Sequence, residues 1–355
     1  MDAMRPRHRI ARAGFAAAVL WTGALSAQAQ IAGWQTFGPP LTSVNGISTA
    51  ADAEETVYAG ASQYDLAQSG LFESTDGGQT WTGLFDADRG DHLSDILVDP
   101  RDSDRLFAGA LGAGGITKIY RSTDRGGAWS LLLTISNACV PSFALGSGSD
   151  GILFVCGTRF FRSADAGQTW VQPATPFTET TSLAAAPGGI LYAYGSTKIF
   201  RSVNLGDSWT PHADAPPGCP SLLVLRLDPS NPSVFVAGTG RLGAGGFQCG
   251  GVYRSENAGG TWTASSLTGV YVTDIAVIPA DPSAVYASAS HIAGLLPEGG
   301  VFGSADGGST FYDLRLPVVS ALHLALSTSG RLLYAATPFG AYVLRSRKTR
   351  VLEPR

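Results

Sequence analysis

Apolar residues along this chain gather in runs of four to eight, separated by short segments rich in Gly, Pro, Ser and Asp. Runs of this length between turn-forming residues are typical of β-strands. No stretch keeps an apolar period of 3.6 residues through three turns, as an amphipathic helix would require. The pattern predicts an all-β protein made of many short strands.

One motif, which we call the box, recurs with the pattern S-x-[DN]-x-G-x-x-[WF]. Its six copies are STDGGQTW from Ser74, STDRGGAW from Ser122, SADAGQTW from Ser163, SVNLGDSW from Ser202, SENAGGTW from Ser255 and SADGGSTF from Ser304. Successive serines lie 39 to 53 residues apart, which is the spacing of propeller blades or solenoid coils. Each box follows two further strands and a third such as GVYRS or KIFRS, and its aromatic residue starts a fourth. Four antiparallel strands per repeat predict the blades of a β-propeller.

The residue types of the box suit a hairpin between the third and fourth strands. An Asp or Asn at the third position can accept hydrogen bonds from backbone N–H groups ahead of it, and Gly allows the positive φ of a tight turn. The Ser hydroxyl can close the turn, and the Trp ring can pack between neighbouring units. The third positions are Asp76, Asp124, Asp165, Asn204, Asn257 and Asp306. Because two of the six are uncharged, a structural role is favoured over acid/base chemistry.

These boxes resemble the Asp-box, or BNR, repeats of sialidase-type β-propellers, which also occur in sortilin-like receptors, xyloglucanases and photosystem II stability and assembly factors. The resemblance covers nearly the whole chain after residue 29. It implies a propeller fold. It does not select a function, because the family includes both enzymes and binding proteins.

The two ends of the chain predict how the ring is completed. The segment VVSALHLALSTSGRLLYAATPFGAYVLRS repeats three strands and stops at Arg345 and Ser346 without a following box, while Trp34 lies outside any box near the start. We therefore predict seven four-stranded blades over residues 30–346, the last closed by the N-terminal strand, which would remove exposed sheet edges. Residues 347–355 form a short basic tail, interpreted as a solvated end rather than a binding arm.

Residues 1–29 have the features of a secretory signal peptide. Four arginines precede the apolar run GFAAAVLWTGAL, and alanines at 27 and 29 form an A-x-A cleavage site before Gln30. We expect cleavage after Ala29 and a secreted or periplasmic protein. The full chain has 24 Lys and Arg against 28 Asp and Glu, and the leader holds four of the arginines. This charge argues against a nucleic-acid partner. No later segment predicts a transmembrane helix, and we expect a monomer.

The four cysteines fit an oxidising compartment. Cys139 and Cys156 flank two strands that should pair, and Cys219 and Cys249 fall at the same rim of the fifth blade. We predict the disulfides Cys139–Cys156 and Cys219–Cys249. No Cys-x-x-Cys pair occurs and His is scarce, so we expect neither a metal site nor a cofactor.

The candidate binding surface is the face opposite the boxes, formed by loops between the second and third strands of each blade. These loops look long in blades one, two, five and six, and function often lies in such loops. On this rim, Asp95, Asp274 and His323 align at one position of the innermost strands, and the last two could pair. Farther out on the rim lie Tyr64, Asp65, Asp91, His92, His291 and Glu298. The alternative is that Asp95 and Asp274 only cap strand starts and that His323 is a packed imidazole.

Two classes of function follow from this sequence. We favour a binding or assembly scaffold for glycan or protein ligands, because no recognisable catalytic set accompanies the boxes. An exo-sialidase would need an arginine triad and an Arg-Ile-Pro motif, which is missing, and a structural role is expected for the arginines beside the boxes: Arg121, Arg162, Arg201 and Arg254. Xyloglucanase-like enzymes place two catalytic Asp residues between two propellers, and the surroundings of Asp65 do not match theirs. The alternative remains a sialidase-like glycoside hydrolase using two of Asp65, Asp95 and Asp274.

Overall fold

The computed structural model describes residues 33–38, 43–62, 69–86, 92–112, 115–136, 141–145, 151–156, 158–178, 182–195, 197–291, 294 and 299–345, with backbone alone at 37, 92, 94, 152–156 and 187. Within these ranges the regular structure is β apart from the 3-10 turn η1 (Pro187–Gly189). The all-β prediction is confirmed. None of the described residues form a helix long and apolar enough to cross a membrane.

The strands form antiparallel sheets in sequence order. The first blade contains β2 (Ser43–Thr49), β3 (Val57–Ser62), β4 (Ser69–Ser74) and β5 (Thr82–Asp86), and the second contains β6 (His92–Val98), β7 (Leu106–Gly112), β8 (Ile116–Ser122) and β9 (Ser130–Ser136). A sheet of three strands follows, with β10 (Pro141–Leu145), β11 (Ile152–Cys156) and β12 (Arg159–Ser163).

The remaining sheets have four strands each. The fourth sheet contains β13 (Ser182–Ala186), β14 (Ile190–Tyr194), β15 (Lys198–Ser202) and β16 (Thr210–Asp214), and the fifth contains β17 (Leu222–Leu227), β18 (Phe235–Gly243), β19 (Gly246–Ser255) and β20 (Thr263–Thr268). The sixth contains β21 (Tyr271–Ile278), β22 (Asp281–Ser290), β23 (Gly300–Ser304) and β24 (Tyr312–Asp313). The last contains β25 (His323–Leu326), β26 (Leu332–Thr337) and β27 (Gly340–Arg345), together with β1 (Trp34–Phe37) from the start of the chain.

The prediction of seven four-stranded blades is wrong in its count. The described residues form six four-stranded blades, and the sheet β10-β11-β12 has three strands. Its third strand is followed only by an isolated bridge between Arg162 and Val171. The segment after this box contains Pro173 and Pro176. The two prolines remove two N–H donors from this segment, although β16 of the next sheet contains Pro211 and still pairs with β15.

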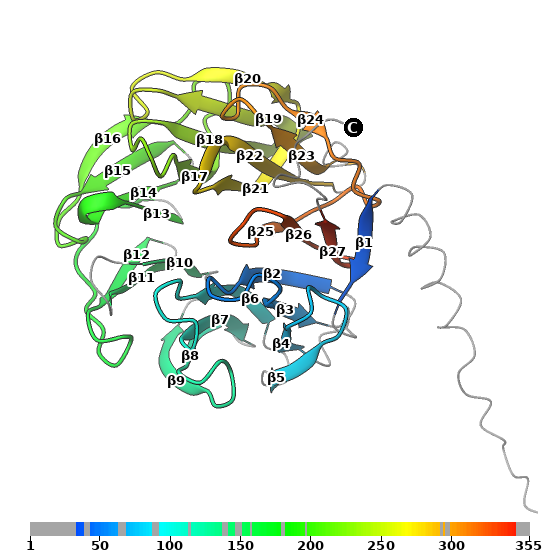
Figure 1. The fold of residues 1–355 in the computed structure, drawn as a ribbon. Helices are drawn as coiled ribbons and strands as arrows, with labels where there is room; N and C mark the ends of the chain where they lie inside the picture. Colours follow the sequence, from blue (N-terminus) through cyan, green and yellow to red (C-terminus); the bar gives the residue numbers. More distant parts are fainter. Residues whose placement is uncertain are drawn as a thin grey trace, which may run out of the picture.

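The sheets are arranged around a central axis (Figure 1). The innermost strands contact one another in the order β2, β6, β10, β13, β17, β21 and β25, and β25 also contacts β2. β1 pairs with β27, with Trp34 opposite Leu344 and Gln35 opposite Val343. The predicted placement of Trp34 in the same sheet as the last strands is therefore confirmed.

The core lies between neighbouring sheets. Strands such as β3 and β26 are buried along their whole length, because both of their faces pack against adjacent sheets. One cluster joins Trp34 and Tyr342 of the last sheet to Tyr286 of the preceding one. Trp34 is fully buried and donates from Nε1 to the carbonyl of Leu314 at 2.8 Å.

The box hairpins share one hydrogen-bond pattern. Ser163 Oγ accepts from the N–H of Gly167 at 2.7 Å and donates to Asp165 Oδ1 at 2.7 Å, while Asp165 Oδ1 accepts from the N–H of Thr169 at 2.8 Å. Gly167 has φ of 85°. Asn204 and Asn257 accept the corresponding N–H bonds in their own boxes. The predicted turn chemistry is confirmed, and the loss of charge does not change it.

The carboxylates of the boxes are held in their ionised form. The Thr169 hydroxyl, followed by its backbone N–H, lowers the pKa of Asp165 to about 2. Side-chain and backbone bonds from the corresponding residues also lower the pKa values of Asp76 and Asp124. An acid that stays ionised and bonded within its own hairpin is poorly suited to proton transfer.

Two of the four arginines beside the boxes, Arg121 and Arg162, link neighbouring sheets. Nη1 of Arg121 donates to the carbonyl of Ala166 in the next box at 2.7 Å, and Arg162 makes the same bond to Leu205 at 3.2 Å. Arg162 also pairs with Asp207 at 2.7 Å. These contacts support the structural role expected for this position, although the main partner of Arg121 is a carbonyl rather than a carboxylate.

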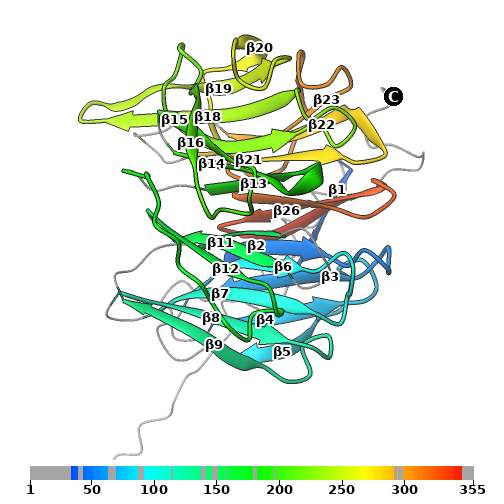
Figure 2. The same cartoon turned by 90° about the vertical axis from the view of Figure 1, so that its left-hand side faces the viewer.

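Two of the predicted long loops are largely strand. β18 and β19 continue as a paired hairpin to Gly243 and Gly246, which projects from the ring (Figure 2). β7 likewise pairs with β8 as far as Gly112 and Ile116. The sequence predicted loops for these two glycine-rich segments, but in the structure they continue the strand pairing. The corresponding loop of blade one, and most of that of blade six, lie outside the described residues.

The disulfide Cys219–Cys249 is present, with Cα atoms 5.6 Å apart. It connects the turn before β17 to β19, so it anchors the projecting hairpin to its own blade. The predicted pair Cys139–Cys156 falls on positions that lie outside the described side chains.

Candidate functional site

The candidate site is the axial cluster, which we define as Asp95, Arg226, Asp274 and His323. These residues lie on β6, β17, β21 and β25, all innermost strands of their sheets. The ladders shift register between Leu93 and Asp95 and again between Val272 and Asp274. Each aspartate therefore follows a β-bulge, a feature that commonly re-aims side chains.

Asp274 is the most heavily bonded member of the cluster. Its Oδ1 accepts from Nη2 of Arg226 at 2.7 Å and from the N–H of Ile275 at 2.8 Å. Its Oδ2 accepts from the N–H of Leu324 at 3.1 Å and lies 3.7 Å from Nδ1 of His323. Burial opposes ionisation, but the Arg226 charge and then His323 outweigh it, so the pKa of Asp274 lies below its ordinary value.

Asp95 has weaker support. Its Oδ1 accepts from the N–H of Ile96 at 2.9 Å and its Oδ2 from the N–H of Phe143 on the next sheet at 3.3 Å. No cation is paired as closely with Asp95 as Arg226 is with Asp274 among the described contacts. Loss of water contacts therefore dominates and raises the pKa of Asp95 to about 6, although the charge of His323 acts in the opposite direction.

Arg226 and His323 are the exposed members of the cluster. Their side chains are 39% and 42% exposed, whereas that of Asp274 is 9% exposed. Burial works against the imidazolium, but the adjacent carboxylate of Asp274 raises the pKa of His323 above its ordinary value. The two cations thus stay in contact with solvent at the axis, while the carboxylate that joins them is covered.

Arg226 was absent from the sequence-based candidates. It lies in the strand sequence LLVLRL, two residues after the position equivalent to Asp95 and Asp274. Side chains two residues apart point to the same side of a strand, so Arg226, like Val224, faces the neighbouring sheet that contains Asp274. The available signal for this residue was an Arg inside an otherwise apolar innermost strand. An alignment limited to the charged residues at the strand starts does not include its position.

The aligned position links neighbouring sheets through backbone bonds. Asp95 accepts from Phe143 and Asp274 from Leu324, and Ser142 makes a weaker contact of the same kind with the N–H of Leu183 at 3.5 Å. In each case the donor follows the equivalent position on the next sheet. This geometry supports the capping interpretation for both aspartates and adds that the caps join adjacent sheets.

Of the other predicted rim residues, only His291 has a described side chain. His291 donates from its backbone N–H to Ser320 Oγ at 3.2 Å. His92 begins β6, but its side chain lies outside the described part, as do Tyr64, Asp65, Asp91 and Glu298. Within the described ranges, no group of three or more His, Cys, Asp or Glu side chains could hold a metal ion.

The fold places this chain in the class of β-propellers. It is similar to a xyloglucanase of Hypocrea jecorina (strain QM6a), with 24% identity over 265 residues that make up 68% of this chain and 28% of that enzyme. The chain thus spans less than a third of that relative's length. No protein-family model matches the chain, so the assignment of its boxes to the Asp-box family stays a prediction.

Solved structures with the same fold include both enzymes and binding proteins. The GH74 xyloglucanase from Xanthomonas campestris superposes with a TM-score of 0.66 at 19% identity, covering 91% of this chain and 54% of that one. The structure described as YCF48 bound to D1 peptide has a TM-score of 0.60 at 15% identity, covering 89% of this chain and 97% of that one. At these identities the likeness shows the fold alone.

Proposed function

We propose that this protein is an exported binding or assembly scaffold that holds a glycan or protein ligand on the face opposite its boxes. One observation carries the proposal: both described axial aspartates are used as clamps between sheets. Asp274 is bonded through both oxygens and Asp95 accepts two backbone N–H bonds. Arg226, His323 and Asp95 are partly exposed at the axis, and these polar groups suit binding.

Hydrolysis of a glycosidic bond needs two carboxyl groups with different protonation states, about 5 to 9 Å apart. Both oxygens of Asp274 already accept hydrogen bonds, from Arg226, Ile275 and Leu324. The structure of YCF48 bound to D1 peptide has the same fold, and this chain covers 97% of its length. This likeness is consistent with a single propeller binding a ligand by itself.

The alternative function is a glycoside hydrolase, either xyloglucanase-like or, as the sequence suggested, exo-sialidase-like. It is favoured by the match to a curated xyloglucanase and by Asp95, whose pKa of about 6 suits a general acid. In this case a second carboxylate, with Asp65 as the sequence-based candidate, would have to complete the pair.

One experiment separates the two functions. The purified protein is incubated with xyloglucan and a panel of fluorogenic glycosides that includes sialosides, beside Asp95→Asn and Asp274→Asn. The scaffold proposal expects no turnover, together with binding on a glycan array or in a pull-down. Turnover by the wild-type protein that Asp95→Asn abolishes would overturn the scaffold and establish the hydrolase.

Export and oligomeric state are separate parts of the proposal. The leader and the disulfide Cys219–Cys249 support a secreted or periplasmic protein, and we propose that it is a monomer. N-terminal sequencing of protein recovered from a secreting host is expected to begin at Gln30. Light scattering is expected to give the mass of one chain, and a dimer mass would contradict the monomer.

A further inference from the structure

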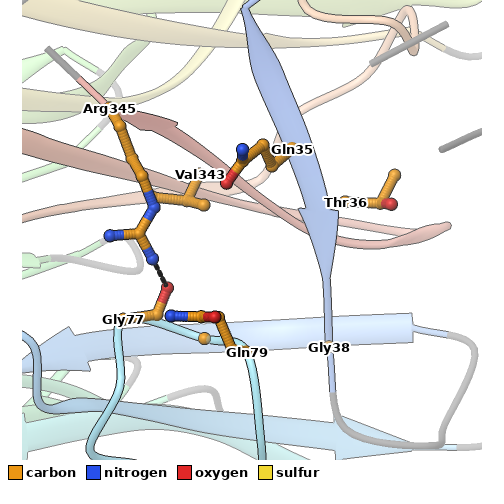
Figure 3. A pocket seen from close by; sticks show the side chains of 8 residues that line it. Gln35, Thr36, Gly38, Gly77, Gln79, Val343 and Arg345 are labelled. Carbon is orange, nitrogen blue, oxygen red and sulfur yellow. Dashed lines mark hydrogen bonds between the residues drawn. The ribbon is translucent and has the colours of Figure 1, made fainter. Parts of the chain in front are cut away.

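A polar pocket of 280 Å³ lies at the seam where the last sheet meets the first blade (Figure 3). We call it the seam pocket. It is lined by residues of β1 and its end, of β27, and of the first box hairpin: Gln35, Thr36, Gly38, Val343, Arg345, Gly77, Gly78 and Gln79. It is on the box side of the ring and includes no member of the axial cluster.

The repeat explains why a pocket forms here. At other junctions a side chain of the preceding blade packs against the box glycine: a Cβ on Gly126 would lie 2.5 Å from Leu84, and one on Gly167 would lie 2.6 Å from Leu132. Leu84 and Leu132 stand where the ladders of β5 and β9 shift register. A bulge therefore supplies the filling residue at these two junctions.

β1 stands at the seam in the place of a fourth strand. It pairs with β27 residue for residue, from Trp34 opposite Leu344 onward, without a register shift, so it has no bulge of this kind. Trp34 is committed to the core cluster with the preceding sheet. The pocket lies where the last sheet is completed by a strand that follows no box hairpin.

The charge in the seam pocket is largely compensated. Arg345 donates from Nη2 to the carbonyl of Gly77 at 2.7 Å, and its Nη1 lies 3.6 Å from Oε1 of Glu55 (Figure 3 shows the first of these bonds). A guanidinium that is already bonded and paired attracts a further anion less strongly. The pocket therefore does not select for a charged ligand.

The remaining polar side chains can both donate and accept hydrogen bonds. Gln35 and Gln79 carry amides and Thr36 carries a hydroxyl. Gln79 Nε2 donates to the carbonyl of Asp76 at 3.0 Å, which fixes the amide at the pocket edge. Sugar hydroxyls also donate and accept, and the volume falls near the lower limit of small-molecule sites. We propose that the seam pocket binds a single neutral sugar residue.

The test uses saturation-transfer NMR on the purified full chain with glucose, galactose, xylose and mannose, and with glucuronate and acetate as charged probes. We expect binding of at least one neutral sugar with a Kd on the order of 1 mM. Gln35→Ala and Gln79→Ala should each weaken it by about fivefold, the effect of one lost hydrogen bond.

Gln168→Ala is the matched control, because Gln168 occupies the same place in the third box and does not line the pocket. It should leave sugar binding unchanged. The proposal is overturned if no neutral sugar binds, if Gln35→Ala and Gln79→Ala bind as well as wild type, or if only the anions bind. Because these variants are remote from the axial cluster, failure here is distinguishable from failure of the proposed scaffold function.

Discussion

Nη2 of Arg226 lies 2.7 Å from Oδ1 of Asp274, although the two residues are 48 positions apart and belong to neighbouring sheets. Asp274 in turn accepts the N–H of Leu324 on the next sheet. One carboxylate therefore connects three sheets at the axis, and the ion pair is part of the structure that holds the ring together.

Replacing Arg226 with Met should destabilise the protein by about 2 kcal/mol, because a covered carboxylate loses a charged hydrogen-bond donor. The partial exposure of Arg226 keeps the loss below that of a fully buried pair. Urea unfolding measures the change. Arg241→Met, at an exposed position on the projecting hairpin, is the control, and an equal loss in both variants would contradict a specific role for the pair.

Stability should depend on His323 more strongly in acid than in base. Its pKa in the folded protein lies above the ordinary 6.5, because Asp274 outweighs burial. The imidazolium therefore contributes stability that is fully present below about pH 6.5 and is lost as pH rises through the folded-state pKa. The groups facing it are Asp95, Asp274 and Arg226.

We expect His323→Gln to lower the melting temperature more at about pH 5.5 than at about pH 8.5. In an Asp274→Asn background the same substitution should show much less pH dependence. An equal effect at both pH values in the wild-type background would show that His323 acts as a packed neutral ring.

Asp165→Asn should be tolerated, whereas Asp165→Ala should destabilise the protein, because alanine leaves the N–H and hydroxyl of Thr169 without their acceptor. Asn204 and Asn257 show that an amide serves the same turn. Chemical unfolding of both variants checks this. Equal destabilisation by Asn and Ala would mean that the charge itself is required.

Gly206→Ala should destabilise the protein by about 1 to 3 kcal/mol more than Gly269→Ala. Both glycines have positive φ, at 86° and 75°, so backbone strain is similar in the two variants. A Cβ on Gly206 would lie 2.1 Å from the ring of buried Phe160, whereas one on Gly269 would meet nothing within 4 Å. Thermal unfolding of the two proteins gives the difference, and equal melting temperatures would refute the clash.

Local chemistry made much of this fold predictable from sequence. The box hairpins form through bonds between residues two to four apart, such as Ser163 with Asp165 and Gly167. Such contacts depend little on the rest of the chain, so their repetition predicts four-stranded units. The place of Trp34 beside the last strands followed because the final repeat lacked one strand.

Two structural predictions made from the sequence were wrong. The third box is complete, yet the segment after it forms no fourth strand, and nothing in the box itself signals this. The glycine-rich run from Gly238 to Gly251 was expected to be a loop, yet it continues β18 and β19. A local turn signal sets where a strand ends only when no partner strand extends the pairing.

The sequence by itself determined the repeating hairpins, the pairing of the chain ends and the disulfide Cys219–Cys249, because each follows from short-range bonding or from counting strands. Only the tertiary structure decided that Arg226 joins Asp274 and that the seam retains a pocket. Both depend on how bulges and side chains of different sheets meet around the axis. Such contacts join residues far apart in the chain, so no single segment encodes them.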